Sequence, residues 1–150
     1  MENKPSDQKG EPGTNDIRNM LSRAGLLPTR QRIALVSLLR RKDETPVSAE
    51  GLYEQLAASG VKCSLSSVYR LARELNEGGF IKCVPLNGAK AFFDTNLAHH
   101  HHFYAVEEDM LIDVSETLIS IEGIPSPPEG YELMSVDLLL RIRRVERREP

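Results

Sequence analysis

At 150 residues the chain has room for one ordinary domain or two small ones. Its composition, 40% hydrophobic and 27% charged residues, is typical of a soluble globular protein. No apolar run approaches the roughly 18 residues of a membrane span, and no apolar segment follows the first residues, so we expect neither a membrane protein nor a secretory signal. The two cysteines, Cys63 and Cys83, form no C-x-x-C pair and suit the reducing cytoplasm, where we expect the protein to reside.

The net charge of −3 conceals an asymmetry along the chain. Residues 16–83 contain eleven Lys and Arg against seven Asp and Glu, a net of +4. Residues 84–150 contain six against twelve, a net of −6. A phosphate-binding module joined to a second module would give this distribution, although ordinary variation in surface charge would give it too.

The first half is predicted to contain four short helices after a polar, disordered tail over residues 1–15. Apolar residues at helical spacing define the first helix, which ends at Gly25. The starts of the other three helices are marked by residues that commonly cap N-termini: Thr29, Ser48, and Ser64 or Ser66.

The fourth helix is strongly amphipathic and is followed by a hairpin. Its apolar residues fall at i, i+3, i+4 and i+7: Val68, Leu71, Ala72 and Leu75. Residues 80–85 and 89–93 are predicted to be two short strands around the turn Asn87–Gly88. Helices followed by a two-stranded hairpin are the order of elements in a winged helix-turn-helix, which we place at residues 16–93.

The remaining residues, 94–150, are predicted to form a small α/β domain. Segments 101–114 and 131–145 are rich in β-branched and large apolar residues, and 115–124 is predicted to be a short helix between them. A strand–helix–strand unit of this size cannot bury both faces of its sheet, so we expect it to pair with a second copy of itself. The predicted fold class is therefore α+β, an N-terminal winged helix-turn-helix followed by an α/β dimerisation and sensing domain.

The fourth helix also presents a polar stripe on the side opposite its apolar residues. The stripe consists of Ser66, Tyr69, Arg70 and Arg73. Arginine can bind a phosphate or a guanine edge, and serines near a helix N-terminus can contact phosphates. Further candidate contacts to double-stranded DNA are Ser64, Ser67, Arg30 and Arg32. A solvated helix face would look similar, and the preceding helix and following hairpin are what favour DNA binding.

Four motifs give the chain a family resemblance. The runs A-G-L-L-P-T-R-Q-R (24–32), V-S-A-E-G-L-Y (47–53) and S-L-S-S-V-Y-R-L (64–71) resemble the ferric uptake regulator (Fur) family in order and spacing. The run F-F-D-T-N-L-A-H-H-H-H-F-Y (92–104) looks most like the iron response regulator (Irr) branch of α-proteobacteria. The resemblance implies a homodimer, with a dimer of dimers as a further alternative, that binds operator DNA through Tyr69 and Arg70.

All four histidines are consecutive, and they are candidate ligands for haem or a metal ion: His99, His100, His101 and His102. In an extended segment the side chains alternate, so His100 and His102 would point away from His99 and His101. One ion therefore cannot easily take all four. Asp94 is the nearest earlier carboxylate, and six more follow the run: Glu107, Glu108, Asp109, Asp113, Glu116 and Glu122. A polar loop without a ligand is the alternative interpretation.

Several ligands of the metal-dependent family members are missing. V-E-E-D (106–109) stands where their first C-x-x-C pair would fall, which excludes a structural Cys₄ zinc site. Pro46 stands where the family has a histidine near V-S-A-E. A complete Fur-type iron site is therefore in doubt, whereas haem needs only one or two axial ligands.

The resemblance to the Irr branch implies a regulator of iron and haem homeostasis that binds DNA under iron limitation and is released by haem. The alternatives are a repressor of the Fur type that responds to Fe²⁺ or Mn²⁺, and a His-rich metal-binding protein without DNA binding. No enzyme is expected, because the sequence contains no H-E-x-x-H, phosphate-binding Gly-rich loop or nucleophile elbow.

Overall fold

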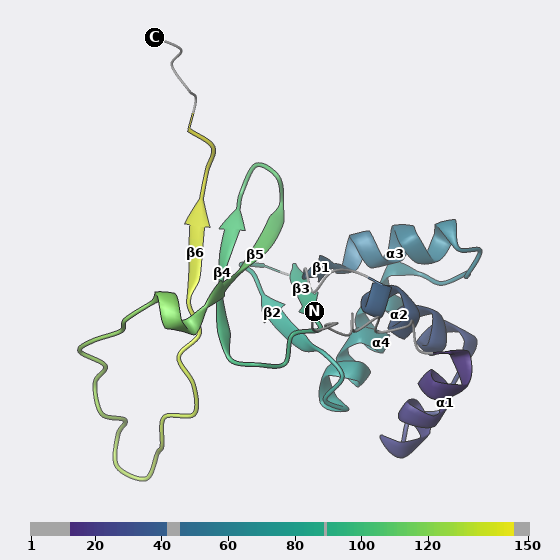
Figure 1. Ribbon diagram of the computed structural model, residues 1–150, viewed down its shortest axis with the longest axis horizontal. Helices are drawn as coiled ribbons and strands as arrows, with labels where there is room; N and C mark the ends of the chain where they lie inside the picture. The colour runs from purple at the N-terminus through teal and green to yellow at the C-terminus, as the bar shows by residue number, and fades with distance from the viewer. Residues whose placement is uncertain (1–12, 42–45, 89, 146–150) are drawn as a thin grey trace, which may run out of the picture.

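The computed structural model describes residues 13–41, 46–88 and 90–145. The N-terminal half contains helices and one small sheet: α1 (Thr14–Arg23), α2 (Arg30–Arg41), β1 (Val47–Ser48), α3 (Ala49–Ala58), α4 (Leu65–Glu77), β2 (Lys82–Pro85) and β3 (Ala91–Asp94). The sheet is antiparallel in the order β1-β3-β2. Four helices and a β2–β3 hairpin, in the predicted order, pack together on one side of the molecule (Figure 1).

Short side chains begin the helices as predicted. The backbone N–H of Arg32 donates to Thr29 Oγ1 at 3.3 Å, at the start of α2. Ser48 caps α3, and Ser64 rather than Ser66 caps α4. Each cap satisfies a backbone donor that the first turn of a helix leaves without a partner.

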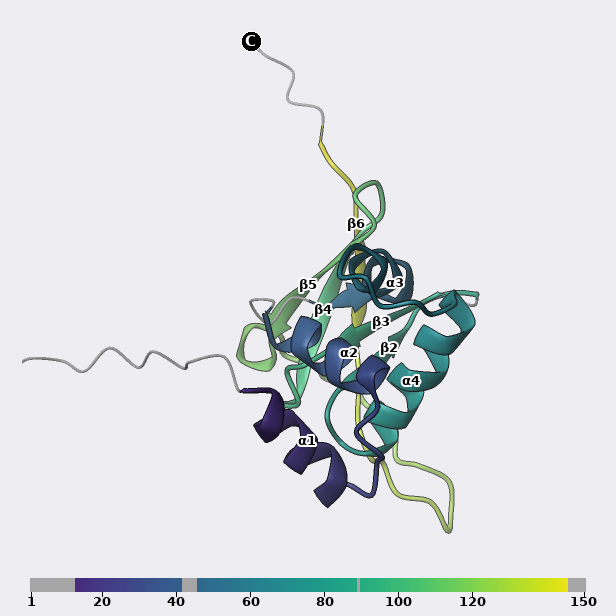
Figure 2. The same cartoon turned by 90° about the vertical axis from the view of Figure 1, so that its right-hand side faces the viewer.

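The core of this half is formed by the apolar faces of all four helices together with β3. Fully buried side chains come from every helix: Leu21, Leu35, Leu52, Leu56, Val68 and Leu75. Burial of each contributes roughly 1.5–3 kcal/mol relative to exposure. The apolar stripe predicted for the fourth helix is entirely within this core, which leaves the opposite side of α4 facing outward (Figure 2).

The C-terminal half is built on a second three-stranded sheet. It contains β4 (His100–Ala105), β5 (Met110–Ser115), a single 3₁₀ turn (Glu116–Leu118) and β6 (Leu139–Ile142). β4 lies in the middle, antiparallel to β5 and parallel to β6. The segment predicted as one strand over 101–114 is thus a hairpin, whose turn includes Asp109 at φ 51°.

Two further expectations for this half were wrong. No α-helix covers 115–124, and the last strand is four residues long rather than 131–145. A helix of this length needs a surface to cover its apolar side, and the single chain offers none: Leu118 is 78% exposed. The segment from the 3₁₀ turn to β6 instead forms a wide loop that stands away from both sheets (Figure 1).

The boundaries of the parts also differ from those predicted. Thr14 and Asn15 already belong to α1, so the tail predicted over 1–15 is wrong at its end, while residues 1–12 lie outside the described chain. The domain boundary expected between residues 93 and 94 falls inside β3, whose last residue is Asp94. Within the described ranges, no helix has the length and apolar character needed to cross a membrane.

A second apolar cluster joins the two halves. Phe92 and Leu86 of the hairpin region pack against Leu111 of β5, with Tyr104 edge-on to Phe92 at 6.3 Å between ring centroids. Lys90 forms an ion pair with Asp109, which also accepts a hydrogen bond from the Tyr104 hydroxyl. The hairpin is therefore held directly against the second sheet.

Candidate metal centre and nucleic-acid interface

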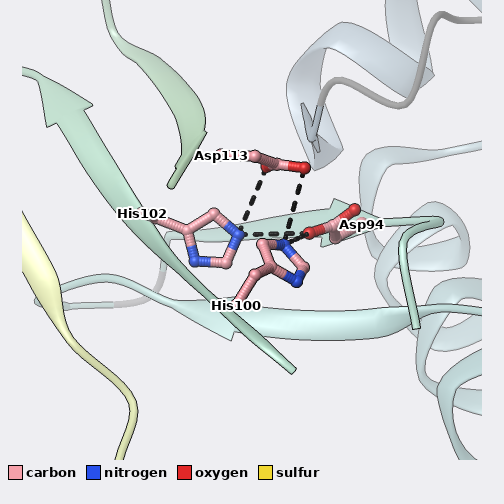
Figure 3. Close-up of side chains that lie close together, drawn as sticks. All are labelled: Asp94, His100, His102 and Asp113. Atoms are coloured by element: carbon pink, nitrogen blue, oxygen red, sulfur yellow. Dashed lines mark hydrogen bonds and ion pairs between the residues drawn. The ribbon is translucent and has the colours of Figure 1, made fainter. Parts of the chain in front are cut away.

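The histidine run leads into β4, which begins at His100, and its side chains alternate as predicted. His100 and His102 point to one side of the strand, toward Asp94 and Asp113 (Figure 3). His99 and His101 lie on the other side, with their rings 5.2 Å apart. We call the first group the Asp–His cluster: Asp94, His100, His102 and Asp113.

The Asp–His cluster is compact and buried. Asp94 Oδ2 lies 2.7 Å from His100 Nε2 and 3.1 Å from His102 Nε2. Asp113 Oδ2 and Oδ1 lie 3.6 Å from the same two nitrogens. Asp94 is 0% exposed and the two histidines are 7% and 8% exposed. Four potential ligand atoms thus come within 4.8 Å of one another.

Strand pairing explains why these residues meet. His102 and Asp113 are partners in the β4–β5 register, so their side chains leave the sheet on the same side. His100 follows at the next position on that side of β4. Asp94 ends β3, where the backbone N–H of Asn96 donates to its Oδ1 at 2.8 Å. The cluster therefore draws one ligand from the first sheet and three from the second.

With both histidines neutral, the cluster has fewer protons than acceptors. His100 Nδ1 is 2.8 Å from the Ala98 carbonyl, the contact that a metal-binding histidine commonly makes through its second N–H. With that proton on Nδ1, Nε2 and Asp94 Oδ2 are both acceptors unless a further proton or a cation lies between them. Asp113 Oδ1 is buried and has no hydrogen-bond partner in the described chain.

The pKa values show the same need for positive charge. Burial opposes charge on both Asp94 and His100, but their hydrogen bonds outweigh it, lowering the pKa of Asp94 and raising that of His100. Burial first, and then the charge of Asp94, raise the pKa of Asp113. A proton shared with His100 is thus the metal-free means of neutralising Asp94.

The donor set fits a divalent transition metal. Two imidazole nitrogens and two carboxylates are ligands that zinc, iron and manganese accept. Ligand atoms of a tetrahedral site with bonds near 2.1 Å are about 3.4 Å apart. The four contacts between histidines and carboxylates, 2.7–3.6 Å, bracket that spacing.

Not every predicted ligand joins the cluster. His99 Nδ1 lies 3.0 Å from Glu116 Oε2, and His101 Nδ1 accepts a hydrogen bond from the Leu138 backbone at 3.3 Å. The sequence identifies Asp113 only as one of six carboxylates that follow the histidine run. No turn signal in the sequence selects it, because the β4–β5 turn around Asp109 has no Gly-containing pair and only the strand register places Asp113 opposite His102.

The polar stripe on α4 is partly accessible. Ser66, Arg70 and Arg73 are exposed, whereas Tyr69 is half-buried. The Tyr69 ring packs edge-on against Phe93 with centroids 6.4 Å apart, and its hydroxyl donates to Glu50 at 3.2 Å. Burial and the nearby Glu50 carboxylate raise the pKa of Tyr69.

The remaining candidate DNA contacts have structural partners. Ser64 caps α4 and its Oγ is 2.9 Å from those of both Ser66 and Ser67. Arg30 lies near the Gly60 carbonyl at 3.5 Å. Arg32 is 14% exposed and binds Glu74, so it is less available to a phosphate than the sequence suggested.

Comparison with known sequences finds consistent relatives. The profile described as the Ferric uptake regulator family matches residues 23–140. The ferric uptake regulation protein of Shigella flexneri is 29% identical over 127 residues, covering 83% of this chain and 86% of that protein. That of Klebsiella pneumoniae is 30% identical over 107 residues, covering 71% and 69%.

Solved structures share the fold. The Vibrio cholerae ferric uptake regulator gives a TM-score of 0.68 at 23% identity, covering 85% of this chain and 98% of that one. The Helicobacter pylori regulator, described as having three functional metal-binding sites, gives 0.64 at 21% identity, covering 95% and 99%. The Pseudomonas aeruginosa regulator with manganese gives 0.61 at 23% identity, covering 85% and 97%. These similarities confirm the predicted α+β fold.

Proposed function

Because this chain belongs to the ferric uptake regulator family, we propose that it is a metal-responsive transcriptional regulator whose α4 helix binds operator DNA. The observation that carries the proposal is the Asp–His cluster, since two imidazoles and two carboxylates converge in a buried position where Asp113 Oδ1 has no hydrogen-bond partner among the described residues. Two of the similar regulators support a divalent ion such as Mn²⁺ or Fe²⁺, because one was solved with manganese and the other has three functional metal-binding sites.

The position of the cluster supports a regulatory role. A bound divalent cation would supply the positive charge that the converging acceptors need. Asp94 belongs to the sheet of the N-terminal half, and the other three ligands belong to the second sheet. The residue before Asp94 is Phe93, which packs against Tyr69 of α4. The placement of Asp94 is thereby linked through one side chain to the helix proposed to read DNA.

The accessible face of α4 supports operator binding. Arg70 and Arg73 project from it and Ser66 lies near its N-terminus, where backbone N–H groups favour phosphate. The half that contains α4 carries the basic part of the sequence, residues 16–83. We place phosphate contacts at Ser66 and Arg73, and a base contact at Arg70.

The C-terminal half supports a homodimer. Both edge strands of its sheet, β5 and β6, have one unpaired side within the described chain. Large apolar side chains stay exposed on and around them: Met110, Ile112, Leu118, Tyr131, Leu133, Met134, Leu140, Ile142 and Val145. A second copy would cover this surface and complete the domain of residues 94–150, and pairs of dimers would add a further contact.

One observation favours haem as a second candidate effector. His99 stands outside the Asp–His cluster, and its side chain is 42% exposed on the other side of β4. An accessible imidazole beside His101 suits an axial ligand, in line with the haem-responsive function that the resemblance to the Irr branch implies. The two hypotheses predict opposite effects on DNA affinity, because haem would release the protein from DNA whereas the metal ion would increase its affinity for DNA.

The experiment uses the full chain and duplexes that it selects from a random-sequence pool. Affinity for the selected duplex is measured by fluorescence anisotropy with a chelator, with Mn²⁺, and with haem monitored by its Soret band. If the metal proposal is correct, Mn²⁺ tightens binding of the wild type and of His99→Ala, but not of the double variant His100→Ala/His102→Ala. If haem instead releases the protein from DNA and only His99→Ala abolishes this release, haem and not the metal ion is the effector.

A further inference from the structure

Glu74 lies on α4 one helical turn after Arg70, and its carboxylate accepts hydrogen bonds from two arginines. Arg32 of α2 donates to Oε2 from Nε at 3.1 Å and from Nη2 at 2.7 Å. Arg70 donates to Oε1 from Nη1 at 3.0 Å. We call this arrangement of Glu74, Arg32 and Arg70 the Glu74 fork; it connects the neighbouring helices α2 and α4 (Figure 2).

One side of the fork is fixed to the loop between α1 and α2. Arg32 also donates from Nη1 to the Leu27 carbonyl at 2.8 Å, so each of its three guanidinium nitrogens has an acceptor. Its side chain is 14% exposed. The hydrogen bond from Arg32, against a smaller effect of burial, lowers the pKa of Glu74, so the carboxylate is charged at neutral pH. Glu74 is therefore an anchored, negatively charged acceptor.

The other side of the fork is open to solvent. The Arg70 side chain is 58% exposed, although one of its nitrogens is held by Glu74. Its remaining N–H donors project from the accessible face of α4. Arg73, by contrast, is exposed and has no ion pair among the residues described. The two arginines of the stripe thus differ, one restrained by a carboxylate and one not.

This difference bears on how DNA is recognised. A freely rotating arginine binds any phosphate it reaches, whereas bidentate binding of a guanine edge requires the guanidinium plane in one orientation. A carboxylate beside the arginine also weakens indiscriminate attraction to phosphate. Resting on the DNA-binding function proposed above, we propose that Glu74 is a positioning residue that determines sequence specificity, by holding Arg70 in the orientation for a base contact.

The test measures specificity separately from affinity. The protein first selects a duplex from a random pool, and its affinity for that duplex and for an unrelated one gives a specificity ratio. The ratio is compared for wild type, Glu74→Gln, Glu74→Asp and Glu77→Gln. Glu77 is the matched control, because it lies on the exposed surface of the same helix, carries the same charge and has no ion pair in the described part of the chain. Arg70→Ala, alone and with Glu74→Gln, completes a double-mutant cycle.

We expect Glu77→Gln to tighten binding to both duplexes alike and leave the ratio unchanged. Glu74→Gln should tighten binding to the unrelated duplex but lower the ratio roughly tenfold, the discrimination that one arginine–guanine contact provides. In the Arg70→Ala background it should leave the ratio unchanged. Glu74→Asp keeps a negative charge opposite Arg32 but withdraws the carboxylate from Arg70. This variant should lower the specificity ratio without increasing affinity for the unrelated duplex. It also provides the test if Glu74→Gln does not fold.

Two results would overturn the proposal. A ratio in the folded Glu74 variants equal to that of Glu77→Gln would mean that only charge matters. A loss that persists in the Arg70→Ala background would mean that Glu74 acts by packing α2 against α4. If the wild-type protein enriches no sequence from the pool, the proposed DNA binding itself is contradicted. This result is distinct from a failure of the role proposed for Glu74.

Discussion

The four consecutive histidines have different partners although they are the same residue type. His100 and His102 converge with Asp94 because they occupy alternate positions on one strand, while their neighbours His99 and His101 face away. Identical residues one position apart thus have different partners: His100 contacts a buried carboxylate and His99 an exposed one. Location on the strand, and not residue type, decides which histidine can bind a metal.

Replacing His100 tests this distinction. His100→Ala removes one of four ligands and should weaken Mn²⁺ binding by at least the roughly 10–100-fold that loss of a ligand's supporting contact usually costs. His99→Ala, the matched control from the same run, should bind Mn²⁺ as the wild type does. Isothermal titration calorimetry of both variants measures it, and equal weakening in the two would place the metal elsewhere.

A second prediction at this scale concerns the serines at the start of α4. Ser64→Ala should lower the free energy of unfolding by about 1 kcal/mol, since its Oγ accepts from the Ser67 backbone N–H at 3.2 Å. Ser66→Ala should cost much less, because its hydroxyl contacts only the Ser64 side chain. Urea denaturation of the two variants compares them, and a larger cost at Ser66 would refute this assignment of the cap.

The elements of the N-terminal half followed closely from the sequence, whereas those of the C-terminal half did not. In α4, local signals agree: a serine cap, an apolar stripe and a following turn all fall within one helix. Over 115–124 the apolar residues suggested a helix, but the surface that such a helix would cover is not part of the single chain. The hairpin β4–β5 was missed because its turn, around Asp109, lacks the Gly-containing pair that marked the first hairpin.

The same lesson applies to the candidate site. Asp94 and the histidine run could be selected from the sequence, because they are only a few residues apart in it and have ligand chemistry. Asp113 could not, since only the register of β4 against β5 brings it opposite His102. Likewise, Arg32 looked like a phosphate contact until its partner Glu74, 42 residues later in the chain, was placed beside it.

The ion pair between α2 and α4 predicts a pH dependence. The pKa of Glu74 is lowered from the usual 4.5, so the stabilisation it gives is present above that value and lost as pH falls through the lowered pKa. The difference in melting temperature between wild type and Glu74→Gln should therefore be largest near neutral pH and shrink as the pH falls through the lowered pKa of Glu74. A difference for Glu74→Gln that stays constant with pH would contradict this explanation.

On the scale of the whole molecule, two sheets meet at the end of β3. The apolar contacts of Phe92 and Leu111 and the Lys90–Asp109 ion pair hold them together, and the Asp–His cluster spans the same junction. A ligand that bridges such a junction stabilises one relative placement of the two parts. The wide loop before β6 lies away from α4, so the proposed dimer surface and the proposed DNA-binding helix are separate surfaces (Figure 1).

The proposed dimer surface can be tested at one position of β6. Leu140 is 38% exposed at the sheet edge, and Leu140→Lys should convert the dimer to a monomer because it places a charge in the apolar contact. Leu27→Lys, at a residue that is 75% exposed in the other half, is the control and should stay dimeric. Sedimentation equilibrium gives the mass of each and distinguishes dimer from tetramer; a dimeric Leu140→Lys would move the interface away from this edge.

The central claim, that a metal ion in the Asp–His cluster controls DNA binding, is tested most directly by operator affinity with and without Mn²⁺. Wild-type protein should bind its selected duplex at least tenfold more tightly with Mn²⁺ than with chelator, a coupling in the usual range for two linked sites of about 1–3 kcal/mol. His100→Ala/His102→Ala should bind equally in both conditions. Wild-type affinity that does not change with the metal would contradict the account.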